Sequence, residues 1–142
     1  MKLQLVTLEG TKFSEDAYSI TLPTAAGEIT VFPDHEPLMS VLVPGVVSVR
    51  KGKNDPDQLI EHFATFGGVL EVTSQGVTVL VDEADSGEEI SEQEAEKARA
   101  AAEKMKSEAK NQVELDKAQA LVDRQAVRLQ VAQLRRRHNR RG

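Results

Sequence analysis

Cysteine and tryptophan are absent from this sequence of 142 residues, and only 4% of its residues are aromatic. Without cysteine, the chain has neither a disulfide framework nor a thiolate nucleophile or metal ligand. Few, scattered aromatic residues give little basis for a surface that stacks nucleic-acid bases. No run approaches the roughly 20 consecutive apolar residues that span a membrane, and the N-terminal residues do not resemble a secretory signal. We therefore expect a soluble, intracellular protein.

Positive and negative charges are distributed unevenly along the chain. Residues 1–85 hold five lysines or arginines against thirteen acids, whereas residues 86–142 hold thirteen against ten. No acid follows Asp123, but seven arginines do. This asymmetry indicates two modules, an acidic one and one with a basic end that suits an acidic partner.

Residues 1–86 have the pattern of a β domain. Short runs rich in Val, Ile, Leu and Thr, several with a period of two, are separated by Gly, Pro, Asn and Asp. Ser-Gln-Gly at 74–76 is typical of a hairpin between two such runs. Because no helical segment separates these runs, they predict an antiparallel β-sandwich or barrel.

Residues 87–142 have the composition of helices. Between Gly87 and Gly142 there is no glycine or proline, and the good helix formers Ala, Glu, Lys, Gln and Arg dominate. Ser91 followed by Glu94 is typical of a capping box at a helix start. A turn at 110–112 predicts a two-helix hairpin. Since no helix breaker enforces that turn, one rod of about 80 Å is the alternative. The expected fold class is α+β, with a sandwich at 1–86 and a helical hairpin at 87–142.

Several residues are capable of chemistry, but none forms a known catalytic or metal-binding pattern. Asp34, His35 and Glu36 are consecutive, so in an extended segment their side chains alternate and do not chelate one ion together. His62 alternates with apolar residues and is better explained as a structural or surface histidine. There is no phosphate-binding glycine motif and no G-x-S-x-G. These patterns predict neither catalysis nor a metal site.

The arginine-rich C-terminus admits two interpretations. Clustered arginines neutralise phosphates and are typical of nucleic-acid binding, but they also occur on solvated helix ends. The acidic first module would repel a phosphate backbone. A basic helix that contacts an acidic protein surface fits the whole chain better.

Two segments resemble the epsilon subunit of bacterial F-type ATP synthases, called delta in mitochondria. Residues 27–49, GEITVFPDHEPLMSVLVPGVVSV, resemble the family's Gly-Glu…Phe/Tyr-Pro-x-His-x-Pro-Leu…Pro-Gly segment. Residues 66–84, FGGVLEVTSQGVTVLVDEA, resemble its Gly-Gly-x-Leu-Glu-Val…Val-x-Val-Leu-x-Asp segment. Together they lie in the order expected for a β module followed by a helical pair.

The resemblance implies a ten-stranded sandwich at the foot of the central stalk, where it contacts the gamma subunit and the membrane-embedded c-ring. It implies a non-catalytic role that couples c-ring rotation to ATP synthesis. The loop implied to face the c-ring contains Gly27, Glu28 and Ile29. The signature turn, which we interpret as structural, contains Pro33, His35 and Pro37.

The resemblance also implies a regulatory role for the helices. Folded as a hairpin they permit turnover; extended, their basic face contacts the alpha and beta catalytic subunits and blocks ATP hydrolysis. The residues implied for that contact are Arg124, Arg128, Arg135 and Arg136. Family members that bind regulatory ATP begin the first helix with Ile/Leu-Asp-x-x-Arg-Ala, whereas residues 90–95 here read Ile-Ser-Glu-Gln-Glu-Ala. Because the Glu94 carboxylate would repel a phosphate, we expect neither regulatory ATP nor another cofactor.

The leading hypothesis is a rotor subunit on the cytoplasmic face of the bacterial inner membrane, attached only through its complex and binding no nucleic acid. The competing hypothesis is a stand-alone β-sandwich adaptor whose basic helices bind RNA or dimerise. An enzyme is the third hypothesis, and it needs a cofactor or turnover that the sequence does not predict.

Overall fold

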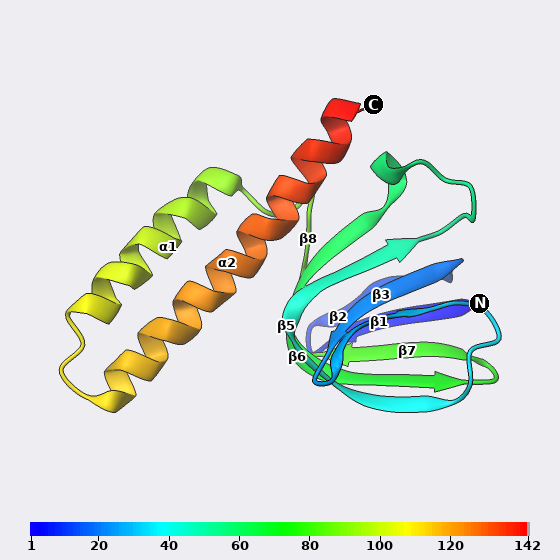
Figure 1. Cartoon of the computed structure of the whole chain (residues 1–142), viewed down its shortest axis with the longest axis horizontal. Coiled ribbons are helices and arrows are strands. Elements are labelled where there is room, and N and C mark those ends of the chain that lie inside the picture. Colours follow the sequence, from blue (N-terminus) through cyan, green and yellow to red (C-terminus); the bar gives the residue numbers. More distant parts are fainter. Residues whose placement is uncertain (142) are drawn as a thin grey trace.

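The computed structural model describes residues 1–141, with side chains described for residues 1–137. Within these residues a β domain is followed by two helices (Figure 1). The elements are β1 Lys2–Thr7, β2 Gly10–Asp16, β3 Ser19–Thr24, β4 Gly27–Val31, β5 Leu38–Arg50, the short 3-10 helix η1 Asp57–Leu59, β6 Glu61–Thr73, β7 Gly76–Val81, β8 Ala84–Ser86, α1 Glu92–Ser107 and α2 Gln112–Arg141.

The strands form one continuous hydrogen-bonded sheet that curls over itself into a sandwich. Their order is β2-β1-β7-β6-β5-β3-β4, and β8 pairs with β6. Neighbours are antiparallel except β1 and β7, which are parallel. β5 and β6 lie on the side of the sandwich that faces the helices (Figure 1). The α+β class, with a sandwich followed by a helical hairpin, is therefore confirmed.

The expected count of ten strands is wrong for this chain: the described residues form eight, because β5 and β6 each run for 13 residues. In β6, Phe63 and Leu70 both belong to the core, although strict alternation would place them on opposite faces. The inversion lies near Gly67 and Gly68, whose φ angles of 98° and 155° favour glycine. A Cβ atom at Gly68 would lie 2.1 Å from the Leu80 carbonyl oxygen. The two glycines thus bend one strand instead of separating two.

The core of the sandwich is self-contained. Every one of its buried members lies between Leu3 and Ala84, so the helices contribute none of them. The largest side chains with almost no exposure are leucines, isoleucine and valines from β1, β3, β4, β5, β6 and β7. Since burial of each such side chain stabilises by about 1.5–3 kcal/mol, the strands have their own source of stability. The side chains with almost no exposure are Leu3, Leu5, Ile20, Leu22, Leu70, Val31, Val47, Val49 and Val79.

One lysine ties the edge strand β2 to the neighbouring strands. Lys51 Nζ lies 3.0 Å from Glu15 Oε2 and 3.6 Å from Glu61 Oε1, and 5.5 Å from the centre of the Phe13 ring. The hydrogen bond to Glu15 is the main cause that raises the pKa of Lys51 above its ordinary value of 10.5. A raised pKa means that folding favours the protonated amine. The resulting stabilisation is complete below pH 10.5 and is lost as the pH rises through the raised pKa.

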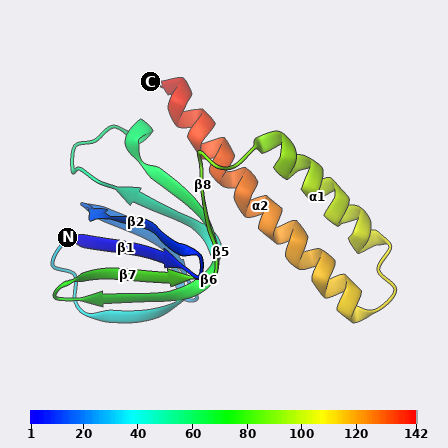
Figure 2. The same ribbon diagram turned by 180° about the vertical axis from the view of Figure 1, so that it is seen from behind.

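The helical hairpin begins and turns at side-chain caps. Ser91 caps α1, because its Oγ accepts a hydrogen bond from the N–H of Glu94 at 3.3 Å. Asn111 precedes α2, and its Oδ1 accepts from the N–H of Glu114 at 2.9 Å. The Glu114 carboxylate in turn accepts from the N–H of Lys110 at 2.8 Å. The predicted turn is confirmed, and the structure adopts the hairpin instead of the rod (Figure 2).

The two helices, which we call the arm, are attached to the sandwich mainly through α2. α1 packs against α2, whereas α2 also packs against β5, β6 and η1. The turn between the helices projects away from the sandwich (Figures 1 and 2). The facing residues of α1 are mostly alanines, with Ala95 and Ala102 buried. Met105, near the end of α1, is 51% exposed.

Candidate functional site

The segment expected to face the c-ring lies at one edge of the sheet. Gly27, Glu28 and Ile29 begin β4, which pairs only with β3 and so ends the strand order. Gly27 follows a tight turn in which the Thr24 hydroxyl donates to its carbonyl oxygen. Gly27 and Glu28 are exposed, whereas Ile29 packs partly against the core. The backbone is thus anchored on one side while the Glu28 carboxylate remains available for a partner.

The signature turn is an exposed β-turn. The N–H of His35 donates to the carbonyl oxygen of Phe32 at 3.3 Å, which closes a turn with Pro33 and Asp34 at its centre. His35 Nδ1 lies 2.8 Å from the carbonyl oxygen of its neighbour Glu36. Asp34 has a φ of 66°, and it is the one non-glycine residue among those described with a positive φ. Proline followed by a positive φ is typical of a type II turn.

The conformation of Asp34 gives a prediction for stability. An L side chain in the left-handed region costs about 1 kcal/mol, and glycine avoids that cost. We expect Asp34→Gly to raise the free energy of unfolding by about 0.5–1 kcal/mol, and Asp34→Val to lower it by at least about 1 kcal/mol, because β-branched residues avoid this region. Urea unfolding of the two variants measures both. Equal stabilities would contradict the turn assignment.

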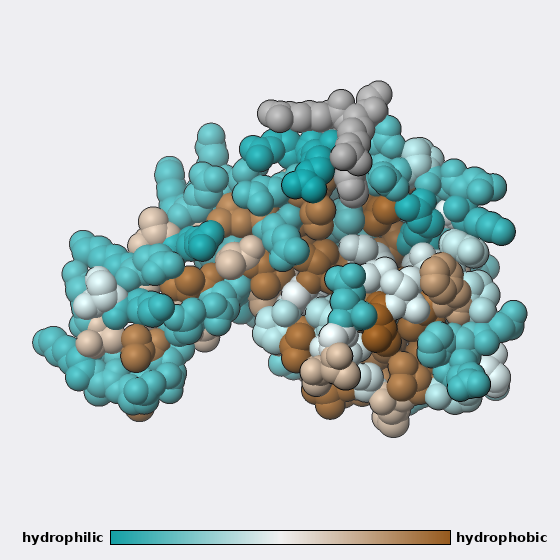
Figure 3. Space-filling view, in the orientation of Figure 1, coloured by the Kyte–Doolittle hydropathy of each residue, from teal (hydrophilic) through white to brown (hydrophobic). Residues whose placement is uncertain are grey.

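An exposed apolar row lies on three neighbouring strands, with Val6 of a fourth strand beside it. Val41 of β5 is opposite Val69 of β6, Val69 is opposite Leu80 of β7, and Leu80 is opposite Val6 of β1. Val41, Val69 and Leu80 are 62%, 38% and 52% exposed, and Met39 beside them is 69% exposed. Figure 3 shows hydrophobic residues over the part of the sandwich that the arm leaves uncovered. We call Met39, Val41, Val69 and Leu80 the outer row.

Sequence inspection missed the outer row. Each member belongs to a strand with apolar residues on both faces, so the alternation that separates core from solvent is weak there. Isolated exposed hydrophobic residues are ordinary, whereas a contiguous group marks an interaction site. The signal became visible only when strand register placed the four residues side by side.

A second apolar cluster joins the arm to the sandwich. Ala64 on β6 is fully buried, as is Val131 on α2. The outer face of β6 is therefore covered here by α2, which explains why residues 62–65 are all buried. We call this cluster the arm interface; its buried members are Ala64, Ile90, Val131 and Ala132, with Val46, Phe66 and Val127 partly buried around them.

Two of the four arginines expected on the basic face bind carboxylates of the sandwich. Arg124 forms an ion pair with Glu83, and its guanidinium lies 4.7 Å from the centre of the Phe66 ring. Arg128 NH1 lies 3.1 Å from Asp85 Oδ2. Both pairs join α2 to the segment at the end of the β domain.

The other two arginines bind within or next to the arm. Arg135 donates to the carbonyl oxygen of Gly87 at 3.1 Å, and Arg136 lies 3.1 Å from Glu92, at the start of α1. All four arginines therefore form an ion pair or a hydrogen bond with another residue of the same chain. The side chains of His138, Arg140 and Arg141, which belong to the same basic end, lie outside the described residues.

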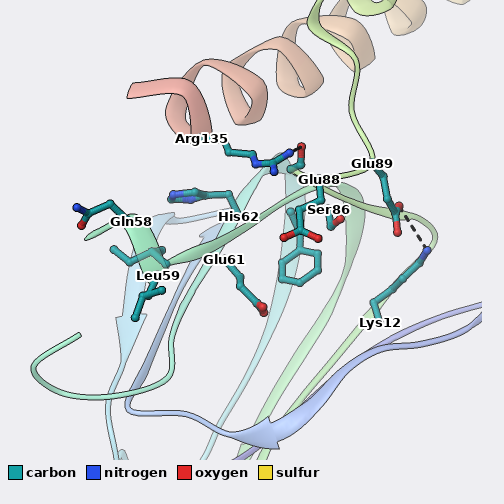
Figure 4. A pocket seen from close by; sticks show the side chains of 12 residues that line it. Lys12, Gln58, Leu59, Glu61, His62, Ser86, Glu88, Glu89 and Arg135 are labelled. Atoms are coloured by element: carbon teal, nitrogen blue, oxygen red, sulfur yellow. Dashed lines mark hydrogen bonds and ion pairs between the residues drawn. The ribbon is translucent and has the colours of Figure 1, made fainter. Parts of the chain in front are cut away.

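A cavity of about 410 Å³ lies where the arm meets the sandwich. Its lining comes from β2, η1, β6, the segment before α1, and α2 (Figure 4). Arg135 reaches over it towards Gly87, and Lys12 pairs with Glu89 across its other side at 3.8 Å (Figure 4). His62 is buried beside it, with Nδ1 2.8 Å from the Ser48 hydroxyl. This cavity is a packing feature of the docked arm.

Asp34, His35 and Glu36 are all exposed on the signature turn. Within residues 1–137, no group of three or more His, Asp or Glu side chains is arranged to hold a metal ion. In the part of the chain that the structure describes, neither helix has the length and hydropathy needed to cross a membrane. The exposed features that stand out among the described residues are the edge strand β4, the outer row and the arm.

Comparison with known sequences gives consistent matches over most of the chain. The family model for the β-sandwich domain of the ATP synthase delta/epsilon chain matches residues 1–87. An ATP synthase epsilon chain from Herpetosiphon aurantiacus is 37% identical over 137 residues, which cover 96% of each chain. One from Chloroflexus aggregans is 38% identical over 133 residues, or 93% of this chain and 91% of that one.

Solved structures give the same fold. A chain in the Euglena gracilis mitochondrial ATP synthase has a TM-score of 0.73 at 24% identity, covering 85% of this chain and 74% of that one. A chain in the Tetrahymena thermophila mitochondrial ATP synthase central stalk and c-ring has a TM-score of 0.60 at 16% identity, covering 93% and 96%. At these identities the comparison establishes the architecture of sandwich plus helices.

Proposed function

Because the chain belongs to the ATP synthase delta/epsilon chain family, we propose that it is the non-catalytic central-stalk subunit that couples c-ring rotation to ATP synthesis and restrains ATP hydrolysis. The family resemblance identified from residues 27–49 and 66–84 is confirmed. The observation that carries the proposal is identity of 37% along 96% of both chains with an epsilon chain. No described feature favours the stand-alone adaptor.

The sandwich supplies two contact surfaces for the rotor. The outer row presents contiguous apolar side chains on rigid strands, as a permanent protein contact requires, and we assign it to the gamma subunit. Glu28 with its neighbours Gly27 and Ile29, on the edge strand, suits the polar c-ring loops. The signature turn of Pro33, His35 and Pro37 connects β4 to β5 and so positions both surfaces relative to each other.

The arm supplies the regulatory part. We infer a boundary between a docking domain, residues 1–86, and a regulatory domain, residues 87–142. In the docked state the arginines that would contact the catalytic subunits bind this chain. In the extended state these four arginines are released to the alpha and beta subunits. They are Arg124, Arg128, Arg135 and Arg136. A switch of this kind requires that the two states differ by only a few kcal/mol.

The proposed site of action is the cytoplasmic face of the membrane, with attachment only through the complex. Regulatory ATP has no expected role in this proposal, because Glu94 lies where the nucleotide-binding pattern requires arginine, and its carboxylate repels phosphate.

Substitution on β4 tests the c-ring contact. We expect Glu28→Lys to weaken binding to c-ring membranes at least about tenfold, because it reverses the exposed charge on this edge strand. Co-sedimentation with membranes stripped of their own epsilon subunit measures this binding. Asn54→Lys, in the exposed loop before η1, is the matched control and should bind normally. Normal binding of the β4 variant would contradict the assignment.

A further inference from the structure

The arm is fixed to the sandwich by two ion pairs that match in spacing. Arg124 and Arg128 are four residues apart on α2, which places them about 6 Å apart along one helix face. Their partners Glu83 and Asp85 are two residues apart at the end of the β domain, about 6.6 Å in an extended chain. The two ion pairs therefore lie side by side and connect α2 to the sandwich. We call these four residues the carboxylate latch.

The latch leaves one guanidinium incompletely satisfied. Arg128 bonds to Asp85 through NH1, whereas its Nε is buried and has no hydrogen-bond partner among the described residues. A buried donor without a partner disfavours the state in which it occurs. A carboxylate that approached Arg128 from outside the chain would satisfy both nitrogens in the bidentate geometry that arginine prefers. The docked state thus holds Arg128 less well than an external acid can.

The other two arginines of the basic face do not belong to the latch. Arg136 pairs with Glu92 of α1, within the arm, and not with a carboxylate of the sandwich. Arg135 binds a carbonyl oxygen, that of Gly87, and not a carboxylate. Only Arg124 and Arg128 exchange a carboxylate of the sandwich for one elsewhere.

We propose that the arm is released by carboxylate exchange: an acidic partner surface displaces Glu83 and Asp85 from Arg124 and Arg128. The inference rests on the proposed function for the identity of that partner, a catalytic subunit. The chemistry defines what the partner presents, namely two carboxylates about 6 Å apart, as on a helix with acids at positions i and i+4. Docking and inhibition exclude each other because they use the same guanidinium groups.

The isolated full-length chain is sufficient for the test. Since it contains no cysteine, Asn54→Cys and Lys110→Cys provide two unique sites for fluorescent dyes on the sandwich and at the tip of the arm. Energy transfer between the dyes reports docking. We expect Glu83→Gln with Asp85→Asn to increase the ratio of undocked to docked molecules about tenfold, since both pairs are lost and the Arg128 guanidinium loses its buried partner.

Matched substitutions separate the latch from general charge effects. Glu9 and Asp82 lie in the same acidic region beside Arg124, and the structure records no ion pair for them among the described residues. Glu9→Gln with Asp82→Asn should therefore leave energy transfer unchanged. Exchanging the charges of one pair, Asp85→Arg with Arg128→Asp, should restore docking lost in Asp85→Arg alone. A helical peptide with glutamates at i and i+4 should undock the wild-type arm.

The proposal is overturned if Glu83→Gln with Asp85→Asn gives the same energy transfer as Glu9→Gln with Asp82→Asn, or if the charge exchange does not restore docking. These results do not depend on ATP synthase, so they distinguish failure of the latch from failure of the stalk role. An arm that undocks as expected but does not change ATP hydrolysis would support the latch and contradict the regulatory function.

Discussion

Leu80→Arg should abolish stable binding to the stalk while leaving the free subunit folded. Leu80 is 52% exposed in the outer row and lies between Val69 and Val6 on the neighbouring strands. An arginine there has access to water in the isolated chain, so unfolding is little affected. In the complex, the same charge would be buried against an apolar surface without a partner. Central interface residues are worth at least about 2 kcal/mol, and we expect a loss of affinity of at least about thirtyfold.

Binding to purified gamma subunit by calorimetry measures this loss. Leu59→Arg is the matched control, because Leu59 is equally apolar and 56% exposed but lies in η1, away from the outer row. The control should bind like the wild type. If both variants bind alike, the outer row is not the stalk contact and the assignment of this face is incorrect.

Ala64→Lys should release the arm although no residue of the arm itself is changed. Ala64 is fully buried at the arm interface, against Val131 and Ala132 of α2. A lysine there overfills the contact between β6 and α2, so the docked state is destabilised by about 1–3 kcal/mol. When the arm is extended, residue 64 is on an open face of β6 and the lysine is solvated. The substitution therefore destabilises the docked state and leaves the extended state unaffected.

The expected result is a shift of most molecules to the undocked state and stronger inhibition of ATP hydrolysis by the catalytic head. Thr11→Lys, which adds the same charge at an exposed position of β2, is the control and should not alter either property. Removing residues 87–142 from the Ala64→Lys variant should abolish the added inhibition. An Ala64→Lys chain whose arm stays docked would contradict the role of the arm interface.

The helices and their boundaries were accessible from local sequence. Absence of glycine and proline, a serine cap and a capped turn are all encoded within a few residues. Ser91 was identified as a cap, and Asn111 with Glu114 carried a similar signal that was missed. The choice between hairpin and rod was not accessible, because it depends on the contact between α2 and β6, residues distant in sequence.

The strands show where sequence patterns fail to predict secondary structure. β2 is difficult to predict from the sequence, because only Phe13 of its seven residues is buried and the edge strand lacks alternation. Paired glycines such as Gly67 and Gly68 are typical of a boundary between strands, but here they bend a single strand. Glycine signals an unusual backbone conformation, but the surrounding hydrogen bonds decide whether the chain turns back or continues.

For the site residues too, the sequence predicts some properties, whereas tertiary packing decides others. The positive charge of Arg128 was evident, but its pairing with Asp85 spans 43 residues and is decided by tertiary packing. Glu28 and His35 were located through family resemblance, and their positions on an edge strand and an exposed turn remain compatible with docking. Their roles stay predictions until binding is measured.

The central claim is that a sandwich docks the rotor while the arm alone restrains hydrolysis. The most direct measurement compares ATP hydrolysis by a catalytic head lacking its epsilon subunit after addition of the full chain or of residues 1–86. The shorter chain retains every buried member of the sandwich core, from Leu3 to Ala84. We predict that both bind the head and that only the full chain lowers its rate of hydrolysis. Equal rates with the two chains would contradict the account.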